Sequence, residues 1–597
     1  MNGKIRILFI ALNVFLSVCF IKSQTVTVTV DAKKEIGRVN PLLYGINVAR
    51  WDEGIFPDST KDMLLTCDRD AIRKVRDGGF TLLKYPGGND ADHYVWNDPN
   101  NSAGEMDTDE YAAFLKAVGA EGFITVNFNE SPALAAEWVR YCNKEKGYNI
   151  KYWEVGDEQW GTWARGHTTP EKYAERFIEF VKAMKAVDST ISVAANVKPS
   201  DDPNDWTYRV LKTAGKYIDM VTFTFYPLPN TNENEDSLLT STTRFRHEYM
   251  TIRNVLRATL PEEKADTMWI INVGYNSISG YPGPITLSIA NALWTADILG
   301  TMAELGTQVA CFWALHNTYP PRGGDYGVLS ADGRNIPSYS YYVFPLYTHL
   351  FGKILVESLS SDPNVSVYAS RFGDDTLSVI FINKDPRNDK ELRVSLRGFD
   401  PSPTGRIWIL DAKRKLQRLP GTQIRIGQTN FSLHLPKYSI VAVQLLRAGA
   451  ILPPVNIALH ARASASSYSL TDPYFGPQSA VDGKLHTRWA SAAWASKDGS
   501  DQQWFQIDLG IPKTFNRIVI RWAKGYGTEY TIAVSVDGKR WNDVLKQSNG
   551  KGKVEQLDFN PVTARYIRLH GTKGSKAIST YSIYEFEVYN THERRSF

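Results

Sequence analysis

The chain has 597 residues, of which 43% are hydrophobic and 22% are charged, a composition typical of soluble globular proteins. Its length exceeds what one hydrophobic core supports and predicts roughly three to four domains. The net charge is only +4, and no dense block of Lys or Arg occurs, which argues against a nucleic-acid partner.

Residues 1–23 have the pattern of a secretory signal peptide. After a basic start, an apolar run covers residues 7–21, and Ser23 supplies a small residue for cleavage. We therefore expect a secreted, periplasmic or cell-surface protein. Valine at position 18 fits a lipoprotein box poorly, which argues against a lipid anchor on Cys19. No later apolar run approaches the ~20 residues of a membrane helix, so no membrane span is expected.

The next region alternates short apolar strands with helical stretches. Eight strands with helices between them predict a (β/α)8 TIM barrel, which we assign to residues 24–350. Residues 25–32 alternate with period two and predict a strand, with the alternative that they join the domain that follows. The expected barrel strands are residues 42–48, 80–85, 123–128, 151–155, 191–197, 220–226, 268–273 and 308–315.

Two all-β regions follow the predicted barrel. Residues 351–446 show alternating strands with turn signals and predict a β-sandwich. Residues 447–456 contain two prolines without periodicity and predict a linker. Residues 457–590 are again rich in strands and predict a second sandwich. The fold class is therefore multidomain: a barrel, an all-β sandwich and a C-terminal β-sandwich.

The candidate chemistry centres on residues 151–163, which read KYWEVGDEQWGTW. An aromatic strand ends at Gly156, and Asp157 and Glu158 stand at its carboxyl end, where barrels place catalytic groups. Nearby aromatic rings desolvate a carboxyl, so we expect the pKa of one of them to be raised toward the range of a general acid. The alternative is an acidic loop after a buried strand.

Several further motifs occur in the same order at predicted strand ends. They are Asn40–Gly45, Lys84–Gly88 with Trp96, Val126–Asn127 with Ser131–Pro132, Ala136–Asn143 and Trp153–Glu158. Together they resemble the α-L-arabinofuranosidases of glycoside hydrolase family 51, and more loosely family 39, over residues 25–446. The resemblance implies hydrolysis of O-glycosidic bonds in a polysaccharide or glycan, with Glu158 as acid/base and no catalytic cofactor.

The C-terminal region carries a second resemblance. Its matching segments are Ala480–Gly483, Thr487–Trp489, Trp504–Gly510, Val536–Gly538 and Tyr584–Tyr589. They resemble discoidin, or factor 5/8 type C, modules, including carbohydrate-binding module family 32. By this likeness Asp482, Thr487 and Glu585 surround a structural Ca²⁺; the alternative is a turn aspartate and two ordinary edge residues. Trp494 and Tyr526 are loop aromatics that are candidates for stacking on sugar.

Three positions depart from the resembled hydrolases. The family's nucleophile is a Glu at the end of the seventh strand, and the aligned residue is Gly274, which has no side chain to attack with. The family's Asn before the acid/base is Asp157, and its His near the end of strand six is Thr224. Retaining hydrolysis needs two carboxyls about 5–5.5 Å apart.

Three interpretations of these departures compete. The chain is an engineered enzyme without its nucleophile, a natural barrel that only binds glycan, or an enzyme with a relocated second carboxyl or an inverting or substrate-assisted mechanism. We favour the third, and Asp157 beside Glu158 could also hold one shared proton. The candidates for a relocated carboxyl are Asp90, Asp92, Glu130 and Asp325.

Polar and aromatic residues near strand ends are candidate sugar contacts, although core or rim packing explains each of them equally well. They are Asn127, Glu130, Trp160, Tyr226, Tyr275, Trp313 and His316. The favoured function is a secreted glycoside hydrolase. The alternatives are a catalytically inactive glycan-binding protein on a degenerate barrel and an adhesive surface protein.

Overall fold

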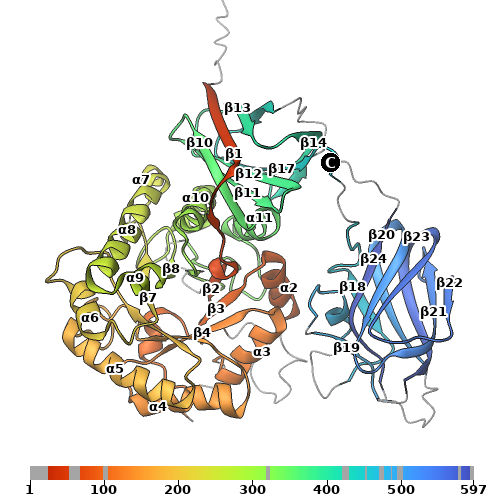
Figure 1. The fold of residues 1–597 in the computed structure, drawn as a ribbon, viewed down its shortest axis with the longest axis horizontal. Coiled ribbons are helices and arrows are strands. Elements are labelled where there is room, and N and C mark those ends of the chain that lie inside the picture. The colour runs from red at the N-terminus through yellow and green to blue at the C-terminus, as the bar shows by residue number, and fades with distance from the viewer. Residues whose placement is uncertain are drawn as a thin grey trace, which may run out of the picture.

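Eight parallel strands close into a barrel in the computed structural model, and helices surround it (Figure 1). The structure describes residues 24–52, 68–98, 105–230, 232–317, 323–419, 429–450, 454–469, 476–485, 487–493, 502–575, 578 and 580–591. The expected signal peptide over residues 1–23 and the loop aromatic Trp494 lie outside these residues.

The barrel strands coincide with the eight that the sequence predicts. In order around the barrel they are β2 (Gly45–Asn47), β3 (Leu82–Tyr85), β4 (Glu121–Val126), β5 (Tyr152–Val155), β6 (Ser192–Asn196), β7 (Met220–Phe225), β8 (Trp269–Tyr275) and β9 (Ala310–Phe312). Both faces of such strands are buried, which explains why they read as nearly continuous apolar runs.

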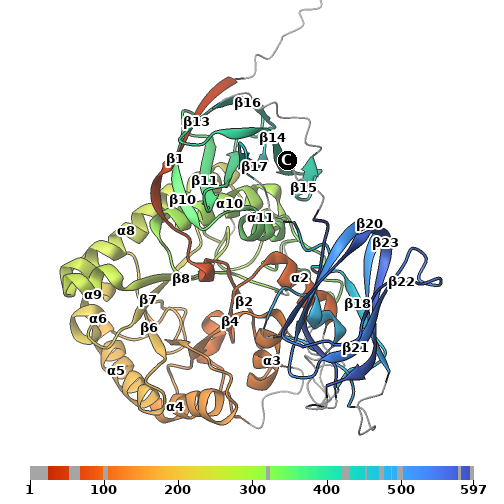
Figure 2. The same ribbon diagram turned by 45° about the vertical axis from the view of Figure 1, so that its right-hand side comes forward.

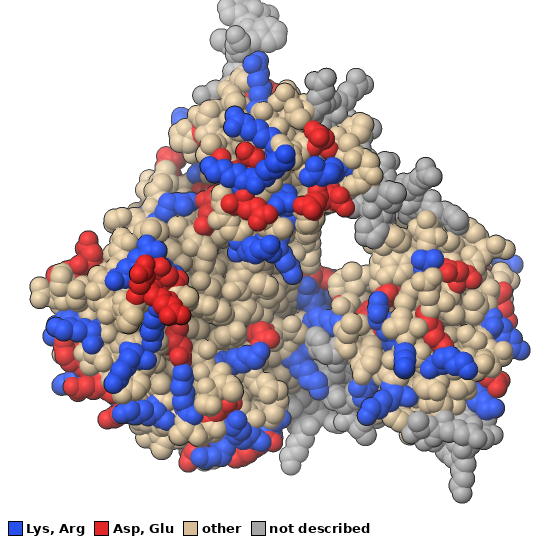
Figure 3. Space-filling model, in the orientation of Figure 1, with Lys and Arg blue, Asp and Glu red and all other residues tan. Residues whose placement is uncertain are grey.

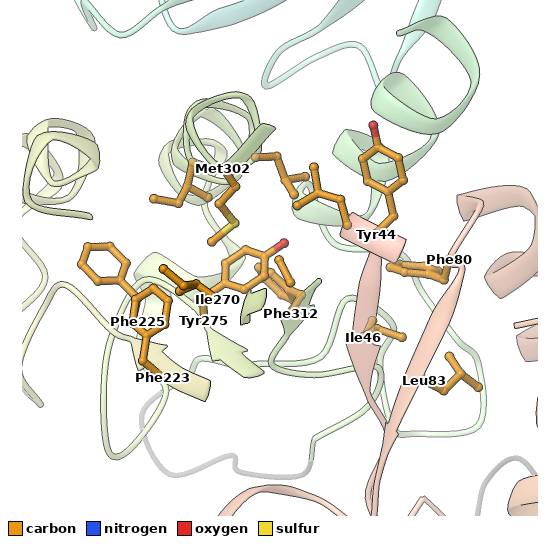
Figure 4. Packing of buried hydrophobic residues seen from close by; sticks show 14 of the residues in the cluster. Tyr44, Ile46, Phe80, Leu83, Phe223, Phe225, Ile270, Tyr275, Met302 and Phe312 are labelled. Atoms are coloured by element: carbon orange, nitrogen blue, oxygen red, sulfur yellow. The ribbon is translucent and has the colours of Figure 1, made fainter. Parts of the chain in front are cut away.

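Helices cover the outside of the barrel. They are α2 (Arg69–Gly78), α3 (Thr108–Val118), α4 (Pro132–Arg140), α5 (Pro170–Val187), α6 (Trp206–Ala214), α7 (Glu235–Thr240), α8 (Thr242–Thr259), α9 (Glu262–Thr267), α10 (Ile289–Leu305) and α11 (Val343–Leu350). Helix α10 is buried on nearly every side, because it lies between the barrel and the next domain. Figure 4 shows Met302 of this helix over Tyr275 and Phe312 of the barrel wall.

The interior of the barrel has an apolar layer and a polar layer. Period-two alternation points every second side chain of a strand inward. The inward residues nearer the amino ends include Leu82, Phe123, Ala194 and Met220. The polar layer lies nearer the carboxyl ends and includes Asn47, Lys84, Thr125, Glu154, Asn196 and Thr222, all buried. The carboxyl end of the barrel is therefore built to hold polar chemistry.

The middle domain is a curled nine-stranded mixed sheet that packs on α10 and α11. Its first strand comes from the N-terminal side of the barrel, since β1 (Gln24–Arg38) pairs with β10 and β13. The other strands are β10 (Ile354–Ser360), β11 (Val365–Phe372), β12 (Thr376–Asn383), β13 (Lys390–Arg397), β14 (Pro401–Leu410), β15 (Gln417–Leu419), β16 (Asn430–Leu435) and β17 (Ser439–Arg447). The strands of this domain therefore come from the segments before and after the barrel in the sequence.

The C-terminal domain is a seven-stranded antiparallel sheet with its own core. Its strands are β18 (Arg462–Ala465), β19 (Trp489–Ala490), β20 (Gln503–Trp522), β21 (Gly527–Ser535), β22 (Asn542–Gln547), β23 (Val554–Gly574) and β24 (Ser582–Tyr589). The domain lies beside α2 and α3 in two views (Figures 1 and 2). Lys484 Nζ donates to the carbonyl of Val118, the last residue of α3. The predicted fold class is confirmed in all three parts.

The surface shows no dominant charge in the view of Figure 3, where basic and acidic side chains are interspersed. Among the described residues, no helix has the length and apolar character needed to span a membrane.

Candidate functional site

A tight turn after β5 presents two adjacent carboxyls at the mouth of the barrel. Gly156 and Glu158 both have a positive φ, 67° and 55°. Such a conformation is uncommon for a glutamate and often marks a functional site. Asp92 braces the turn from below, accepting hydrogen bonds from the backbone N–H of Asp157 at 2.9 Å and of Phe128 at 2.8 Å. Burial raises the pKa of Asp92 to about 8.

A buried lysine neutralises the floor of the site. Lys84 Nζ lies 3.2 Å from a carboxylate oxygen of Glu154 and 3.4 Å from one of Asp157. All three side chains are at most 6% exposed, and buried charges persist only when they are paired. Glu154 is further bonded by Thr125 at 2.8 Å and by Asn196 at 3.1 Å. The pKa of Glu154 is raised by its burial, against the lowering effect of Lys84.

Glu158 is held at both carboxyl oxygens. The Thr224 hydroxyl donates to Oε1, and the Trp163 indole donates to Oε2 at 2.8 Å. Burial raises the pKa of Glu158, the negative charge of Asp157 raises it further, and the donors to the carboxylate oppose both effects. Glu158 is therefore oriented and biased toward the protonated form, as a general acid requires.

Asp157 and Glu158 lie close together because they share a donor. Asn89 Nδ2 is 2.7 Å from Asp157 Oδ2 and 3.5 Å from Glu158 Oε2. The two oxygens are therefore no more than about 6 Å apart, less than the ~6.5–9.5 Å that separates the carboxyls of inverting enzymes. An inverting mechanism in which these two residues flank an attacking water does not fit this spacing.

Tyr226, the residue after β7, lies against Gly274, the position that the resemblance aligns with the family's nucleophile. A Cβ atom built on Gly274 would lie 2.9 Å from the hydroxyl oxygen of Tyr226 and 3.5 Å from Cγ2 of Thr224. The first distance is shorter than real Cβ contacts, so any side chain at position 274 requires Tyr226 to move. The pKa of Tyr226 is raised by burial and by the negative charges of Glu158 and Asp157, which argues against a phenolate there.

A small cavity opens beside the two carboxyls, with about 160 Å³ of unfilled space. Its residues come from the four consecutive strands β5 to β8. They are Glu154, Asp157, Glu158, Trp160, Asn196, Val197, Thr222, Phe223, Thr224 and Val273. The cavity therefore combines carboxylates and hydroxyls with an apolar patch, as small-molecule sites do.

The expected sugar contacts are distributed unevenly around this cavity. Trp160 lines it, and the Tyr226 hydroxyl lies beside Gly274, the residue that follows the lining residue Val273. Asn127 and Glu130 line a separate aromatic cavity next to Trp96 and Trp138. The side chain of Asn127 is engaged by the protein: it donates to the carbonyl of Tyr94 in the loop after β3 at 3.1 Å and accepts from the backbone N–H of Asn129 at 2.8 Å. Trp313 packs edge-on against Trp51, at a ring separation of 6.4 Å.

Two of the expected sugar contacts are not placed for that role. Tyr275 is fully buried outside the barrel wall, where it packs against Trp294 and Phe312 (Figure 4). A β-bulge explains this, because Ile271 and Val273 face the interior and the pairing with β9 shifts between Asn272 and Tyr275, which turns Tyr275 outward. His316 is 6% exposed and its two ring nitrogens lie 3.1 Å from Asp52 and 2.7 Å from Asn335, so it braces the rim instead.

Three of the four candidate relocated carboxyls are engaged elsewhere. Asp90 pairs with Arg50, and Asp92 accepts the backbone bonds described above. Asp325 accepts from the backbone N–H of Gly327 at 2.7 Å, and its burial raises its pKa to about 6. Within the described ranges, no hydrogen bond connects Asp90, Glu130 or Asp325 to Glu158. Asp157 is the carboxyl that the structure brings to Glu158.

Three important residues were not anticipated as site residues. Lys84 is a charged residue inside an apolar strand, which signals a buried partner of opposite charge. Asn89 follows a Gly-Gly pair at the end of that strand, a position where polar loop residues reach the mouth. Trp163 belongs to the same stretch as Glu158 and is 60% exposed, which leaves one face of its ring available for a sugar.

The C-terminal domain brings its three expected metal ligands together. The Thr487 hydroxyl lies 2.9 Å from both carboxylate oxygens of Asp482, and Glu585 Oε1 accepts from the backbone of Gly483 at 2.8 Å. Glu585 Oε2 is buried without a hydrogen-bond partner. Burial and the adjacent Asp482 raise the pKa of Glu585 to about 8. An oxygen-binding cation would satisfy this atom and relieve the repulsion, so the residues fit Ca²⁺.

Comparisons with known proteins agree with both resemblances. Residues 75–244 match the alpha-L-arabinofuranosidase 1 domain, and residues 462–586 match the F5/8 type C domain. A probable alpha-L-arabinofuranosidase C of Aspergillus clavatus is 25% identical over 228 residues, 32% of this chain and 45% of that protein. The chain thus spans less than half the length of this relative. The intracellular exo-alpha-(1->5)-L-arabinofuranosidase 1 of Bacillus subtilis is 25% identical over 449 residues, 62% of this chain and 87% of that protein.

Solved structures show the same fold. The alpha-L-arabinofuranosidase from Thermotoga maritima has a TM-score of 0.59 and 19% identity, covering 70% of this chain and 100% of that one. The GH51 enzyme from Thermotoga petrophila has a TM-score of 0.60 and 20% identity, covering 70% and 99%. The resemblance inferred from the sequence is confirmed: the homologues are alpha-L-arabinofuranosidases, and the C-terminal domain is of the F5/8 type C kind.

The expected Ca²⁺ ligands in the C-terminal domain yield a stability prediction. Ca²⁺ should raise the melting temperature of this domain in the full chain, because a ligand that binds only the native state stabilises it. Differential scanning calorimetry with Ca²⁺ and with a chelator measures the shift. Glu585→Gln should abolish the shift, whereas Glu555→Gln, on β23 of the same sheet, should retain it. A transition indifferent to Ca²⁺ and chelator refutes the site.

Proposed function

We propose that this protein is a glycoside hydrolase that cleaves O-glycosidic bonds in a polysaccharide or glycan, with Glu158 as the general acid/base. The observation that carries this proposal is the environment of Glu158. Its carboxyl is fixed by Thr224 and Trp163, has a raised pKa, and lines the cavity at the carboxyl end of the barrel. The arabinofuranosidase relatives support the same class of reaction.

Glu158 would act in two stages. As an acid it would give its proton to the oxygen of the departing sugar while the anomeric carbon gains positive charge. As a carboxylate it would then take a proton from the water that completes hydrolysis. The adjacent Asp157, paired with Lys84, would hold negative charge near the developing cation without competing for the Glu158 proton.

The proposal extends to location and to the accessory domain. The signal-like N-terminus supports export, so we propose a secreted or cell-surface protein. The F5/8 type C domain would hold the barrel on a glycan, since such domains include carbohydrate-binding modules. The hydrogen bond from Lys484 to the end of α3 supports a defined orientation of this domain relative to the barrel.

A second candidate function rests on Gly274. No carboxylate at this position can form a glycosyl ester, so a barrel that only binds glycan is the alternative. The alternative predicts glycan binding without turnover, so the assay below distinguishes the two.

Glu158→Gln should lower kcat by about 10²–10⁴-fold on any glycoside that the wild type cleaves, because it removes the transferable proton. Folding should persist, since the amide keeps the shape of the carboxyl. The matched control is Glu145→Gln, an exposed glutamate that precedes β5 at the opposite end of the barrel. Equal kcat values for Glu158→Gln and the wild type would contradict the assignment of Glu158 as the general acid/base.

The pH profile should report the same carboxyl. Activity requires protonated Glu158, so kcat/KM should fall as pH rises through its raised pKa. Trp163→Phe removes a donor to the carboxylate, which raises the pKa further and moves this alkaline limb to higher pH. Thr224→Val removes the other donor and should move the limb in the same direction. A limb that neither variant moves belongs to another group.

A further inference from the structure

The site has an acid but lacks a protein nucleophile in the expected place. Position 274 has no side chain, and Tyr226 occupies the space beside it. Asp157 is too close to Glu158 to leave room for an inverting water between them, as their shared bond to Asn89 shows. Among the carboxyls of the described residues, this leaves Asp157 as a source of the attacking atom, and the other source is the substrate itself.

The contacts of Asp157 favour a supporting role over direct attack. Its Oδ1 lies 3.4 Å from Lys84 Nζ and its Oδ2 accepts from Asn89 at 2.7 Å. A carboxylate bound on both oxygens is a weakened nucleophile, but each oxygen keeps a lone pair for one more donor. Such a group is suited to accept an N–H bond and to stabilise a positive charge beside it.

The cavity beside Asp157 has the composition that an acetamido group requires. Asp157 can accept the amide N–H at one side. Val273, whose side chain belongs to the inner cluster of the barrel, lines the cavity and offers an apolar contact for the methyl group. A sugar with only a hydroxyl at C2 would leave this apolar lining unused.

Tyr226 supplies the missing donor for the amide carbonyl. Its hydroxyl lies where a side chain of residue 274 would begin. Within the part of the chain that the structure describes, this hydroxyl forms no hydrogen bond to the protein. Its pKa is raised, so it keeps its proton and can donate to an oxygen of the substrate.

We propose that the substrates are 2-acetamido-2-deoxy glycosides with the acetamido group trans to the leaving group, and that the acetamido oxygen is the nucleophile. This inference rests on the proposed function, because it assigns the substrate class of the same site. Substrate-assisted hydrolysis is an established exception to the use of two protein carboxyls. Substrate assistance explains how a barrel without a nucleophile at position 274 can still hydrolyse a glycoside.

The atoms balance in two steps. In the first, the acetamido carbonyl oxygen bonds to the anomeric carbon, the bond to the leaving oxygen breaks, and that oxygen takes the Glu158 proton. Asp157 accepts the N–H of the resulting cationic five-membered ring. In the second, Glu158 takes a proton from water, the hydroxide bonds to the anomeric carbon, and the ring oxygen leaves to restore the acetamide. The product keeps the anomeric configuration.

The test uses the full chain and matched fluorogenic substrates. The 4-methylumbelliferyl β-glycosides of N-acetylglucosamine and N-acetylgalactosamine are compared with those of glucose and galactose and with aryl α-L-arabinofuranosides. At least one acetamido substrate should be cleaved roughly 100-fold faster than its 2-hydroxy counterpart, as expected for a positioned catalytic group. Successive fluorination of the acetyl group should slow the wild type, because it weakens the attacking oxygen.

Variants then assign the residues. Asp157→Asn should lower kcat on the acetamido substrate roughly 10²-fold. Tyr226→Phe should also lower kcat on the acetamido substrate, because it removes the donor to the acetamido oxygen. The matched control is Asp297→Asn, a buried aspartate paired with Lys384 at 3.0 Å between α10 and the middle domain, which should leave kcat unchanged. If Asp157→Asn fails to fold, the fluorination series still tests the acetamido nucleophile, because it uses only the wild-type protein.

The outcomes separate this inference from the proposed function. Faster cleavage of 2-hydroxy glycosides that still depends on Glu158 overturns the substrate class and leaves the hydrolase standing. Rates insensitive to fluorination overturn the nucleophile in the same way. Absence of cleavage across the whole panel and its oligosaccharides overturns both and favours the glycan-binding alternative.

Discussion

The ammonium group of Lys84 is the charge on which the site depends. It is buried among carboxyls at the carboxyl end of the barrel, within 3.4 Å of both Glu154 and Asp157. A buried carboxylate without a partner would take up a proton or destabilise the fold by several kcal/mol. Lys84 pairs with Asp157 beside Glu158, and the negative charge of Asp157 contributes to the raised pKa of Glu158. One lysine thus links the packing of the barrel to the chemistry at its mouth.

The sequence predicted the barrel well because local patterns encode it. Apolar runs bounded by glycines and separated by helical stretches mark each strand, and all eight were located correctly. The position of Glu158 followed from the strand that precedes it. Local patterns do not encode which distant strand pairs with which, and this is why the pairing of β1 with β10 and β13 remained one of two alternatives.

The details of the site depend on contacts between residues far apart in the chain. The bond from Asn89 to Asp157 joins two loops that are 68 residues apart, and the bond from Thr224 to Glu158 spans 66. No periodicity signals such pairs. Tyr275 and His316 were selected for residue type near strand ends, but their side chains are buried in packing. Strand alternation from Ile271 and Val273 would place Tyr275 inward, and the shift in pairing just before it, which the sequence does not signal, turns it outward.

The three departures from the arabinofuranosidase pattern form one connected arrangement. A decaying site would be expected to lose its buried charges first, because each unpaired one destabilises the fold without any compensating activity. Here the substituted Asp157 has acquired two partners, Lys84 and Asn89, and the substituted Thr224 donates to Glu158. Gly274 leaves the space in which the Tyr226 hydroxyl lies. Each change is matched by a neighbour, which favours a site rebuilt for a different substrate over the remnant of a lost one.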